Sequence, residues 1–339
     1  MLLSLFNYYT RLRFHFILLL LFMVGCGPAD NTLVLKLAHG LDSSHSVHEG
    51  MVYMAELVEE KSDGEMRIDI YPNEQLGTER EALELLQIGS LDITKVSSAV
   101  MESFTPIYSI FGIPFLFNNE DHMYAIQDGP IGKRILDASR PYRIVGLAYY
   151  DAGTRSFYTS NRPVRTPEDL NGLSIRVQES ATAIRMVNTL GGSATPISWG
   201  ELYTALQQGV VDGAENNAPS FYLSRHYEVS KYYTLNEHTA SPDILLFSEH
   251  TWENTLNEEQ RAIIQEAALE SVPHQRELWA EASETALKAV EEAGVEIIRP
   301  DREPFMEASQ PIYDHLESQQ PELYELMIEI QEVGNEYLD

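Results

Sequence analysis

Hydrophobic and polar residues change period repeatedly along the first part of the chain. The mostly apolar run Leu33–Ala38 predicts a buried strand. Apolar residues at helical spacing predict a helix over Ser43–Lys61. The alternating run Met66–Tyr71 then predicts a half-buried strand. Strand and helix therefore follow one another from the start of the pattern.

The next segment continues this alternation. A helix is expected over Thr78–Ile88, because Thr78 and Glu81 form the pattern of a capping box at its start. The run Leu91–Val96 predicts a third strand. Regular alternation of strands and helices favours a mostly parallel sheet with helices on its faces, so the predicted fold class is α/β.

The second half carries further elements of both kinds. Strands are predicted at Ile144–Tyr149, Arg155–Thr159 and Ile244–Ser248, and helices at Thr182–Leu190 and Trp199–Gln208. The turn around Gly153 is a candidate crossover to a second lobe, and Ile244–Ser248 is assigned back to the first. The length of the chain allows two α/β lobes, and two crossings would place them around a cleft.

A long amphipathic pattern follows the last of these strands. It predicts a helix over Asn257–Ala293 that Asn257 caps together with Gln260. Pro273 lies inside the pattern and is expected to kink or break the helix near Val272. The remaining segment, 310–338, is expected to be mainly helical.

One arginine stands out among the predicted strands. Arg176 lies near the end of the short apolar run 173–177, and the amide pair Asn216–Asn217 follows the later turn at Asp212–Gly213. In open α/β domains, loops at the carboxyl ends of strands are the usual place for small ligands. The planar fork of arginine matches a carboxylate. This pattern predicts a pocket for a small organic acid.

Charge narrows the classes of partner. The chain has 52 acidic and 23 basic residues, a formal net charge of −29. Proteins that bind nucleic acid carry basic patches, so no nucleic-acid partner is expected. An acidic chain is also unsuited to docking on anionic lipid headgroups. No glycine-rich phosphate loop or nucleophile-elbow motif is present, and we expect neither an enzyme nor a cofactor.

The first residues have the form of an export signal. Basic Arg11 and Arg13 precede the apolar run 16–24, which is too short to span a bilayer. Gly25 stands before Cys26, the only cysteine of the chain, in the pattern of a lipoprotein cleavage box. We therefore expect a signal peptide over residues 1–25, acylation of Cys26 and a periplasmic, membrane-anchored protein. One cysteine also allows no internal disulfide.

Several motifs in order carry a resemblance to a known family. They are Tyr71-Pro72-Asn73-Glu74-Gln75-Leu76-Gly77, Gly89-Ser90-Leu91-Asp92, Gly153-Thr154-Arg155, Thr159-Ser160-Asn161-Arg162, Arg176-Val177-Gln178-Glu179-Ser180 and Ala214-Glu215-Asn216-Asn217. With these motifs the chain resembles the DctP-type solute-binding proteins of TRAP transporters from about Leu33 to about Asp314. That family captures carboxylated solutes outside the inner membrane and passes them to a membrane permease.

The resemblance implies an architecture and partners. It implies a two-lobed periplasmic-binding-protein-like fold with a hinge and a long connecting helix. We assign residues 31–152 and 241–280 to lobe I, 153–240 and 281–320 to lobe II, and 321–339 to a C-terminal helical tail. The implied partners are a small-molecule carboxylate and the membrane subunits of a TRAP permease.

The resemblance also assigns roles to individual residues. Arg176 matches the arginine that clamps the ligand carboxylate, and Arg155 matches a second arginine, for which a hinge salt bridge is the alternative. Asn216 matches a ligand-contacting amide, whereas Asn217 has a turn role as its alternative. Trp199 matches an aromatic position beside the ligand, with core packing as the alternative.

Two further residues are assigned with less support from the pattern. Glu179 is expected either to orient Arg176 or to accept hydrogen bonds from ligand hydroxyls. His45 belongs to a group with His39 and His48 at the first strand–helix junction. The resemblance places His45 at the cleft, while exposed histidines or a metal site are the alternatives, although no zinc signature is present.

The motifs resemble most closely those members that bind sugar acids. The expected ligand is a hexuronate such as glucuronate or galacturonate. The alternative is a C4-dicarboxylate or another hydroxy or keto acid, which would require a second cationic group facing Arg176. A uronate hydrolase or lyase is a further alternative that no motif supports.

Overall fold

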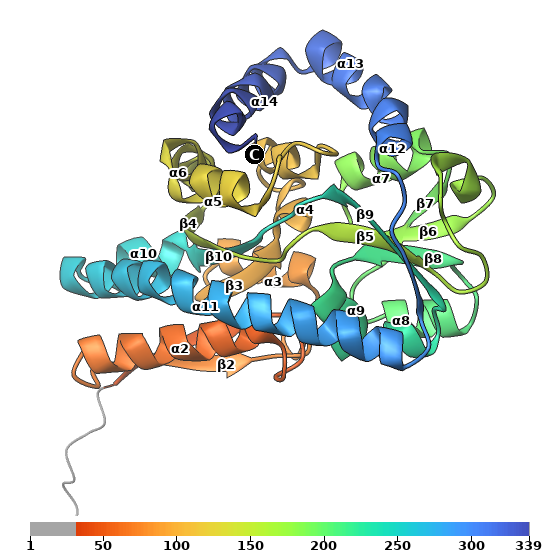
Figure 1. Ribbon diagram of the computed structural model, residues 1–339. Coiled ribbons are helices and arrows are strands. Elements are labelled where there is room, and N and C mark those ends of the chain that lie inside the picture. Colours follow the sequence, from red (N-terminus) through yellow and green to blue (C-terminus); the bar gives the residue numbers. More distant parts are fainter. Residues whose placement is uncertain (1–31, 339) are drawn as a thin grey trace, which may run out of the picture. The chain divides into compact units, whose positions relative to one another are not determined.

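A computed structural model describes residues 32–338 of the chain (Figure 1). The predicted signal peptide, residues 1–25, and the acylation site Cys26 lie outside the described residues. The described chain forms two separate sheets with helices around them. The predicted fold class, a two-lobed periplasmic-binding-protein-like α/β fold, is confirmed by this architecture and by the solved structures compared below.

The first sheet has the strand order β2-β1-β3-β10-β4. Its strands are β1 (Leu33–Ala38), β2 (Met66–Tyr71), β3 (Ile93–Ser97), β4 (Ile144–Tyr150) and β10 (Asp243–Ser248). Strands β1 and β3 are parallel, whereas β10 runs antiparallel between β3 and β4. The strand predicted at Ile244–Ser248 therefore returns to the sheet formed by the first part of the chain.

Helices adjacent to this sheet begin at side chains that cap them. Helix α2 (Ser46–Lys61) begins three residues later than predicted, because the His45 side chain accepts a hydrogen bond from Val47 N. Helix α3 (Glu79–Gln87) begins with the predicted capping box of Thr78 and Glu81. The segment after β3 continues through α4 (Ser98–Met101), the 3-10 helix η1 (Pro106–Gly112), α5 (Glu120–Asp128) and α6 (Pro130–Asp137).

The second sheet has the strand order β11-β9-β5-β8-β6-β7. Its strands are β5 (Arg155–Thr159), β6 (Ser174–Val177), β7 (Ser193–Pro196), β8 (Gly213–Asn216), β9 (Tyr232–Thr239) and β11 (Glu296–Ile298). Strand β6 is parallel to β7 and β8, while β5 is antiparallel to β8 and β9. Three helices belong to this part of the chain: α7 (Ala181–Thr189), α8 (Leu202–Gln207) and α9 (Ala218–Leu223).

One long helix, α11 (Glu258–Glu292), contacts elements associated with both sheets. After α10 (Glu249–Asn254), it packs on α2 and β4 of the first sheet and on α9 of the second (Figure 1). The predicted cap by Asn257 and Gln260 is present. The expected break near Val272 is absent, because α11 runs on through Pro273. Contacts of α11 with α2, β4 and α9 stabilise the helix although Pro273 supplies no N–H.

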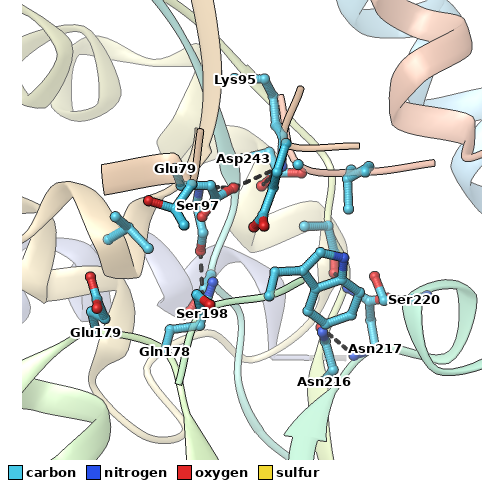
Figure 2. Close-up of a pocket in the computed structure, with 18 of the residues that line it drawn as sticks. Glu79, Lys95, Ser97, Gln178, Glu179, Ser198, Asn216, Asn217, Ser220 and Asp243 are labelled. Carbon is cyan, nitrogen blue, oxygen red and sulfur yellow. Dashed lines mark hydrogen bonds and ion pairs between the residues drawn. The ribbon is translucent and has the colours of Figure 1, made fainter. Parts of the chain in front are cut away.

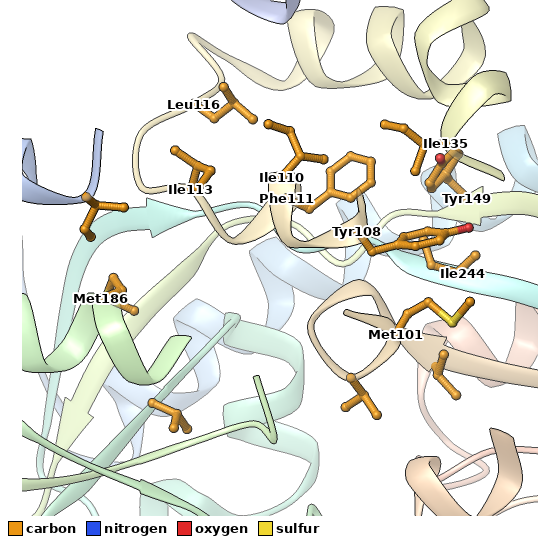
Figure 3. Close-up of a cluster of buried hydrophobic side chains, with 14 of the residues drawn as sticks. Met101, Tyr108, Ile110, Phe111, Ile113, Leu116, Ile135, Tyr149, Met186 and Ile244 are labelled. Carbon is orange, nitrogen blue, oxygen red and sulfur yellow. The ribbon is translucent and has the colours of Figure 1, made fainter. Parts of the chain in front are cut away.

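The C-terminal helices are part of the core. Helices α12 (Glu303–Ala308), α13 (Gln310–Gln319) and α14 (Pro321–Gly334) place Phe305, Ile312 and Ile330 in a large buried cluster. Figure 3 shows part of that cluster, where the ring centroid of Phe111 in η1 lies 5.6 Å from that of Tyr149. Among residues 32–338, no helix is both long and apolar enough to cross a membrane.

Candidate functional site

One cavity is lined by residues from elements of both sheets. It encloses about 710 Å3 of empty space including its open mouth. All seven residues predicted to bind ligand line it: His45, Arg155, Arg176, Glu179, Trp199, Asn216 and Asn217. The fold thus gathers residues that are up to 172 positions apart in the sequence, from 45 to 217.

Arg176 is a buried cation with spare hydrogen-bonding capacity. It lies on β6 and is 2% exposed. Its Nε donates to Ile197 O at 2.8 Å, while Nη1 has no hydrogen-bond partner within residues 32–338. Burial lowers the pKa of the guanidinium below its ordinary value. No carboxylate of the described chain forms an ion pair with Arg176, so an anion in the cavity would find an available guanidinium.

Trp199 lies beside this guanidinium. The Cζ atom of Arg176 is 5.7 Å from the centre of the Trp199 ring, and that ring is 5.1 Å from the ring of His226. Trp199 is half-buried at the cavity wall. Trp199 therefore forms the part of the cavity wall next to the Arg176 guanidinium, at a distance typical of a cation–π contact.

Arg155 is largely committed to a neighbour within the protein. Its Nε and Nη2 bind the Glu215 carboxylate at 2.5 and 2.9 Å, and Nη2 also donates to Glu215 O at 2.8 Å. Its Nη1 donates to Asn216 Oδ1 at 2.9 Å. Burial opposes ionisation of Glu215, but Arg155 and His238 outweigh it and lower the Glu215 pKa to about 2.

These contacts bear on both predictions made for Arg155. Four of the five guanidinium N–H groups are used internally, which agrees with the salt-bridge alternative. One N–H of Nη1 is left for a ligand. A contact between Arg155 and a bound carboxylate stays a prediction.

The two asparagines at the end of β8 differ in their partners. Asn216 Oδ1 accepts from Arg155 and from the Asn217 backbone N–H. Asn217 caps α9 by accepting from Ser220 N at 2.8 Å, and its Nδ2 donates to Ala152 O at 3.0 Å. Both ends of the Asn217 amide are therefore used, as its predicted turn role requires. The Nδ2 group of Asn216 is the part of this pair best placed to bind a solute.

His45 reaches across the cavity. Val47 N donates to its Nδ1, so the other ring nitrogen carries the proton and donates to Ser220 Oγ at 3.3 Å. Burial, followed by the nearby charge of Lys95, lowers the His45 pKa to about 3. His45 is thus neutral at physiological pH and joins the start of α2 to the start of α9.

Glu179 is exposed at the edge of the cavity (Figure 2). In the described chain it makes no hydrogen bond to Arg176, which is oriented by Ile197 O instead. The expectation that Glu179 orients the arginine is therefore not met by these contacts. Acceptance of hydrogen bonds from a solute stays a prediction.

The sequence analysis missed a charged cluster on the opposite wall. Lys95 in β3 is 2% exposed, and its Nζ lies 3.2 Å from Glu79 Oε1 and 3.1 Å from Asp243 Oδ1. Burial opposes the charge of Lys95, but Asp243 and Glu79 outweigh it and raise the Lys95 pKa. Figure 2 shows this cluster on one side of the cavity and Asn216 and Asn217 on the other. A lysine inside an apolar strand was the signal in the sequence.

The two walls also touch directly. Ser97 Oγ donates to Gln178 Oε1 at 3.3 Å, and Gly200 N donates to Glu74 Oε1 at 3.3 Å. Trp279 of α11 contributes a further buried side chain to the lining. The cavity is therefore bounded by both sheets and by the long helix.

The histidines do not form a metal site. His39 Nε2 and His48 Nδ1 lie 2.9 Å apart and share a hydrogen bond, while His45 caps α2. Burial lowers the pKa of His39 to about 2. In the part of the chain that the structure describes, no group of three or more histidine, cysteine or acidic side chains is arranged to hold an ion.

Comparison with known proteins identifies the family. The family model of DctP, bacterial extracellular solute-binding protein family 7, matches residues 37–320. The chain belongs to the DctP family. The resemblance drawn from its motifs is thereby confirmed, and solute binding is the activity of the family as a whole.

Solved structures of other members have the same fold. The TRAP periplasmic solute-binding protein of Anaerococcus prevotii, with bound α/β-D-glucuronate, is 37% identical with a TM-score of 0.88, covering 91% of this chain and all of that one. The protein of a Bradyrhizobium species, in complex with α/β-D-galacturonate, is 39% identical with a TM-score of 0.85, covering 88% and 99% of the two chains.

A relative in Salmonella typhimurium, the uncharacterized protein YiiZ, is 42% identical over 304 residues. The match covers 89% of this DctP family member and 92% of YiiZ. The similarity therefore extends over nearly the whole length of both chains.

Proposed function

We propose that this protein binds a hexuronate, such as D-glucuronate or D-galacturonate, in the cavity between its two sheets. The observation that carries the proposal is the buried Arg176 guanidinium, which has an unpartnered Nη1 and no ion pair in the described chain. A carboxylate placed there would form charge-assisted hydrogen bonds worth roughly 1.5–3 kcal/mol. The hexuronates bound to the Anaerococcus and Bradyrhizobium proteins support this class of ligand.

The remaining lining suits the hydroxyl groups of such a solute. Asn216 Nδ2 can donate and Glu179 can accept at the cavity edge, whereas the Nε2–H group of His45 already donates to Ser220 Oγ. Trp199 offers a ring face to the apolar side of a sugar. The last free N–H of Arg155 provides a second donor to the carboxylate.

We also propose how the solute is captured and delivered. Residues 31–152 and 241–280 form lobe I, 153–240 and 281–320 form lobe II, and 321–339 form the tail. Contacts from both walls to one ligand favour the closed arrangement of the lobes. The closed protein then docks on the membrane subunits of a TRAP permease, as the TRAP proteins among its structural relatives suggest.

The anchoring of the protein is a separate proposal based on sequence alone. Residues 1–25 act as a signal peptide, and acylated Cys26 holds the protein at the periplasmic face of a membrane. Replacing Cys26 by serine should release the protein from the membrane fraction. Retention of Cys26→Ser in that fraction would contradict the anchor.

Thermal unfolding against a panel of acids tests the ligand. A solute that binds only the folded state stabilises it by about 2.7 kcal/mol at a hundred times its Kd. We expect D-glucuronate or D-galacturonate to raise Tm, succinate to leave it unchanged, and Arg176→Ala to abolish the shift. A shift with succinate alone would contradict the hexuronate and establish the dicarboxylate alternative.

The dicarboxylate alternative has one observation in its favour. Lys95 lies on the wall opposite Arg176, where a second cation was expected for such a ligand. Its charge is however already engaged by Glu79 and Asp243. The arrangement of Lys95, Glu79 and Asp243 therefore bears on the choice between a hexuronate and a dicarboxylate ligand.

A further inference from the structure

Three charged side chains from three elements meet at the wall opposite Arg176. Lys95 comes from the middle of β3, Glu79 from the first turn of α3, and Asp243 from the start of β10. Strands β3 and β10 are paired neighbours, with Leu245 opposite Lys95 and Asp243 opposite Ser97. The cluster is therefore fixed by the sheet itself and by the capped start of α3.

The cluster carries more negative than positive charge. The Lys95 ammonium lies between two carboxylates, which gives one positive and two negative formal charges and hence a net charge of −1. Burial raises the pKa of Asp243, and the Lys95 ammonium, whose Nζ lies 3.1 Å from Asp243 Oδ1, opposes that rise. This wall is thus poorly suited to receive an anion.

The unpaired oxygens of the cluster are suited to hydroxyl groups. Glu79 Oε1 accepts from Lys95 and from Ser97 N, and Asp243 Oδ1 accepts from Lys95. The second oxygen of each carboxylate makes no hydrogen bond within residues 32–338. Ionised carboxylates only accept, so the partners they leave room for are donors.

The opposite wall has the reverse character. Arg176 is buried, has an unpartnered Nη1 and lies in the same cavity as the cluster. Arg155, the other arginine of that wall, is neutralised by Glu215. The cavity therefore has one uncompensated cation at one end and one excess negative charge at the other.

We infer that the Lys95–Glu79–Asp243 cluster makes the site specific for monocarboxylates that carry hydroxyl groups at the end far from the carboxylate, and that it rejects a second carboxylate there. The inference rests on the proposed function and adds a basis for discrimination. It predicts that hexuronates bind while the matching aldarates, in which C1 is also a carboxylate, are excluded.

The other charged groups of the lining agree with this polarity. Arg80, the remaining cation near the cluster, is about half exposed and lies 3.5 Å from Glu84, so solvent and that partner weaken its field. Glu74 and Glu179 add further negative charge near the mouth. A second carboxylate placed at the cluster would meet the carboxylates of Glu79 and Asp243, with Lys95 already shared between them.

Calorimetric titration of charge-neutralising variants tests the inference. The ratio of Kd for D-glucarate to Kd for D-glucuronate is measured in the wild type, in Asp243→Asn and in Glu79→Gln. Each variant removes the excess negative charge from a different element while keeping the size of the side chain. We expect the ratio to be high in the wild type and to fall at least about tenfold in each variant, given the strength of charge repulsion at contact distance. Comparing ratios cancels the difference in shape between the two sugars.

Asp63→Asn is the matched control. Asp63 is exposed on the turn after α2 with a positive φ of 50°, a conformation that asparagine tolerates, and it does not line the cavity. The Asp63→Asn variant removes one negative charge from the surface and should leave the ratio of the two Kd values unchanged.

The outcomes separate this inference from the proposed function. A wild type that binds glucarate as tightly as glucuronate, or an unchanged ratio in both variants that still bind glucuronate, would overturn the charge inference alone. If the wild type binds neither glucuronate nor galacturonate, the proposed function falls and this inference falls with it. If the ratio falls in Asp63→Asn as well, global charge and not the cluster sets the selectivity.

Discussion

At the scale of single residues, Arg176 is a buried charge whose interactions within the protein are incomplete. Its Nε has a backbone partner and its ring neighbour is Trp199, but Nη1 has no partner in the described chain. A desolvated guanidinium without a counter-ion is costly to the folded state. A ligand carboxylate would relieve that cost, and we therefore propose that the binding energy is concentrated at Arg176.

Replacing Arg176 by lysine should distinguish the contribution of the planar guanidinium from that of its positive charge. Lysine keeps the cation and loses the paired donors, so we expect Kd for the hexuronate to rise about tenfold to hundredfold. Isothermal titration calorimetry measures the change. Arg165→Lys is the matched control, because Arg165 is exposed and pairs with Glu296 away from the cavity. An unchanged Kd in Arg176→Lys would contradict the assignment of the ligand carboxylate to Arg176.

Asp151 provides a prediction about pH. It is buried between β4 and β5, accepts from Gly153 N at 2.7 Å and from Tyr124 Oη, and burial raises its pKa to about 6. The folded state therefore holds the proton more tightly than the unfolded state, and this residue lowers stability as pH rises from about 4 through 6.

The variant Asp151→Asn should remove this dependence. Between pH 5 and pH 8, we expect its free energy of unfolding to improve relative to wild type by about 1 kcal/mol. Urea unfolding of both proteins at the two pH values measures the difference. A constant difference between the proteins across that range would show that Asp151 does not titrate there.

Some residues of the cavity could be predicted from the sequence, and others could not, for physical reasons. Arg176, Arg155 and Asn216 lie in motifs that can be recognised without a structure. Lys95 and Glu79 lie in elements for which no site role was predicted, and Asp243 comes directly before the predicted strand Ile244–Ser248, far from both in the chain. Their contact depends on the pairing of β10 with β3, which no local pattern specifies.

At the scale of elements, local signals placed most boundaries within a few residues. Helices α3 and α11 begin at the capping boxes that the sequence indicated, because a cap depends only on residues that are neighbours in the chain. The start of α2 was predicted too early, because a histidine cap is outside the usual set. The break that was one expected effect of Pro273 does not occur, and the packing of α11 on α2 and α9 that supports the helix is a tertiary effect.

A carboxylate after α4 connects the two walls through a helix end. Glu102 accepts from Ser180 Oγ at 2.5 Å and from Thr182 Oγ1 and N at 2.9 and 3.2 Å, at the start of α7. Glu102 follows β3 and α4 of the first sheet, whereas α7 follows β6, which bears Arg176. The negative charge suits the N-terminus of a helix.

We expect Glu102→Gln to weaken this connection between the walls. The loss of charge at the helix end should raise Kd about two- to fivefold, mainly through a faster dissociation rate. Stopped-flow fluorescence measures both rate constants. Asp137→Asn is the control, because Asp137 is an exposed carboxylate that pairs with Lys133 and does not line the cavity. Equal rates in Glu102→Gln and wild type would assign Glu102 to capping alone.

At the scale of the whole molecule, the net charge and the site charge have opposite signs. The chain carries a formal charge of −29, yet its proposed ligand is an anion. The Debye length is about 30 Å at 0.01 M salt and about 8 Å at 0.15 M. In dilute salt, an approaching anion is therefore repelled by the charge of the whole protein surface. At physiological salt this long-range repulsion is screened, and the attraction of Arg176 at short range remains.

The association rate constant should consequently increase with ionic strength. Raising salt from about 0.01 to 0.15 M screens the global repulsion before it screens the short-range contact with Arg176. Stopped-flow measurement at several salt concentrations gives the association rate constant. Sucrose, which is uncharged, serves as the control for effects of an added solute other than screening. A rate constant that falls with salt would show that the cavity cations dominate the field at its mouth.

The two-sheet architecture also explains what the sequence left open at this scale. Composition and motif order indicated two α/β units, while the return of β10 to the first sheet and the contacts of α11 with both sheets define how the chain is distributed between them. The cavity exists only because residues from 40 to 279 converge on it.

A crystal structure of the mature protein with D-glucuronate tests the central claim most directly. We predict that both carboxylate oxygens lie within hydrogen-bonding distance of the Arg176 guanidinium and that the C1 hydroxyl faces Glu79 and Asp243. A carboxylate bound at Lys95, or a sugar bound outside this cavity, would contradict the account.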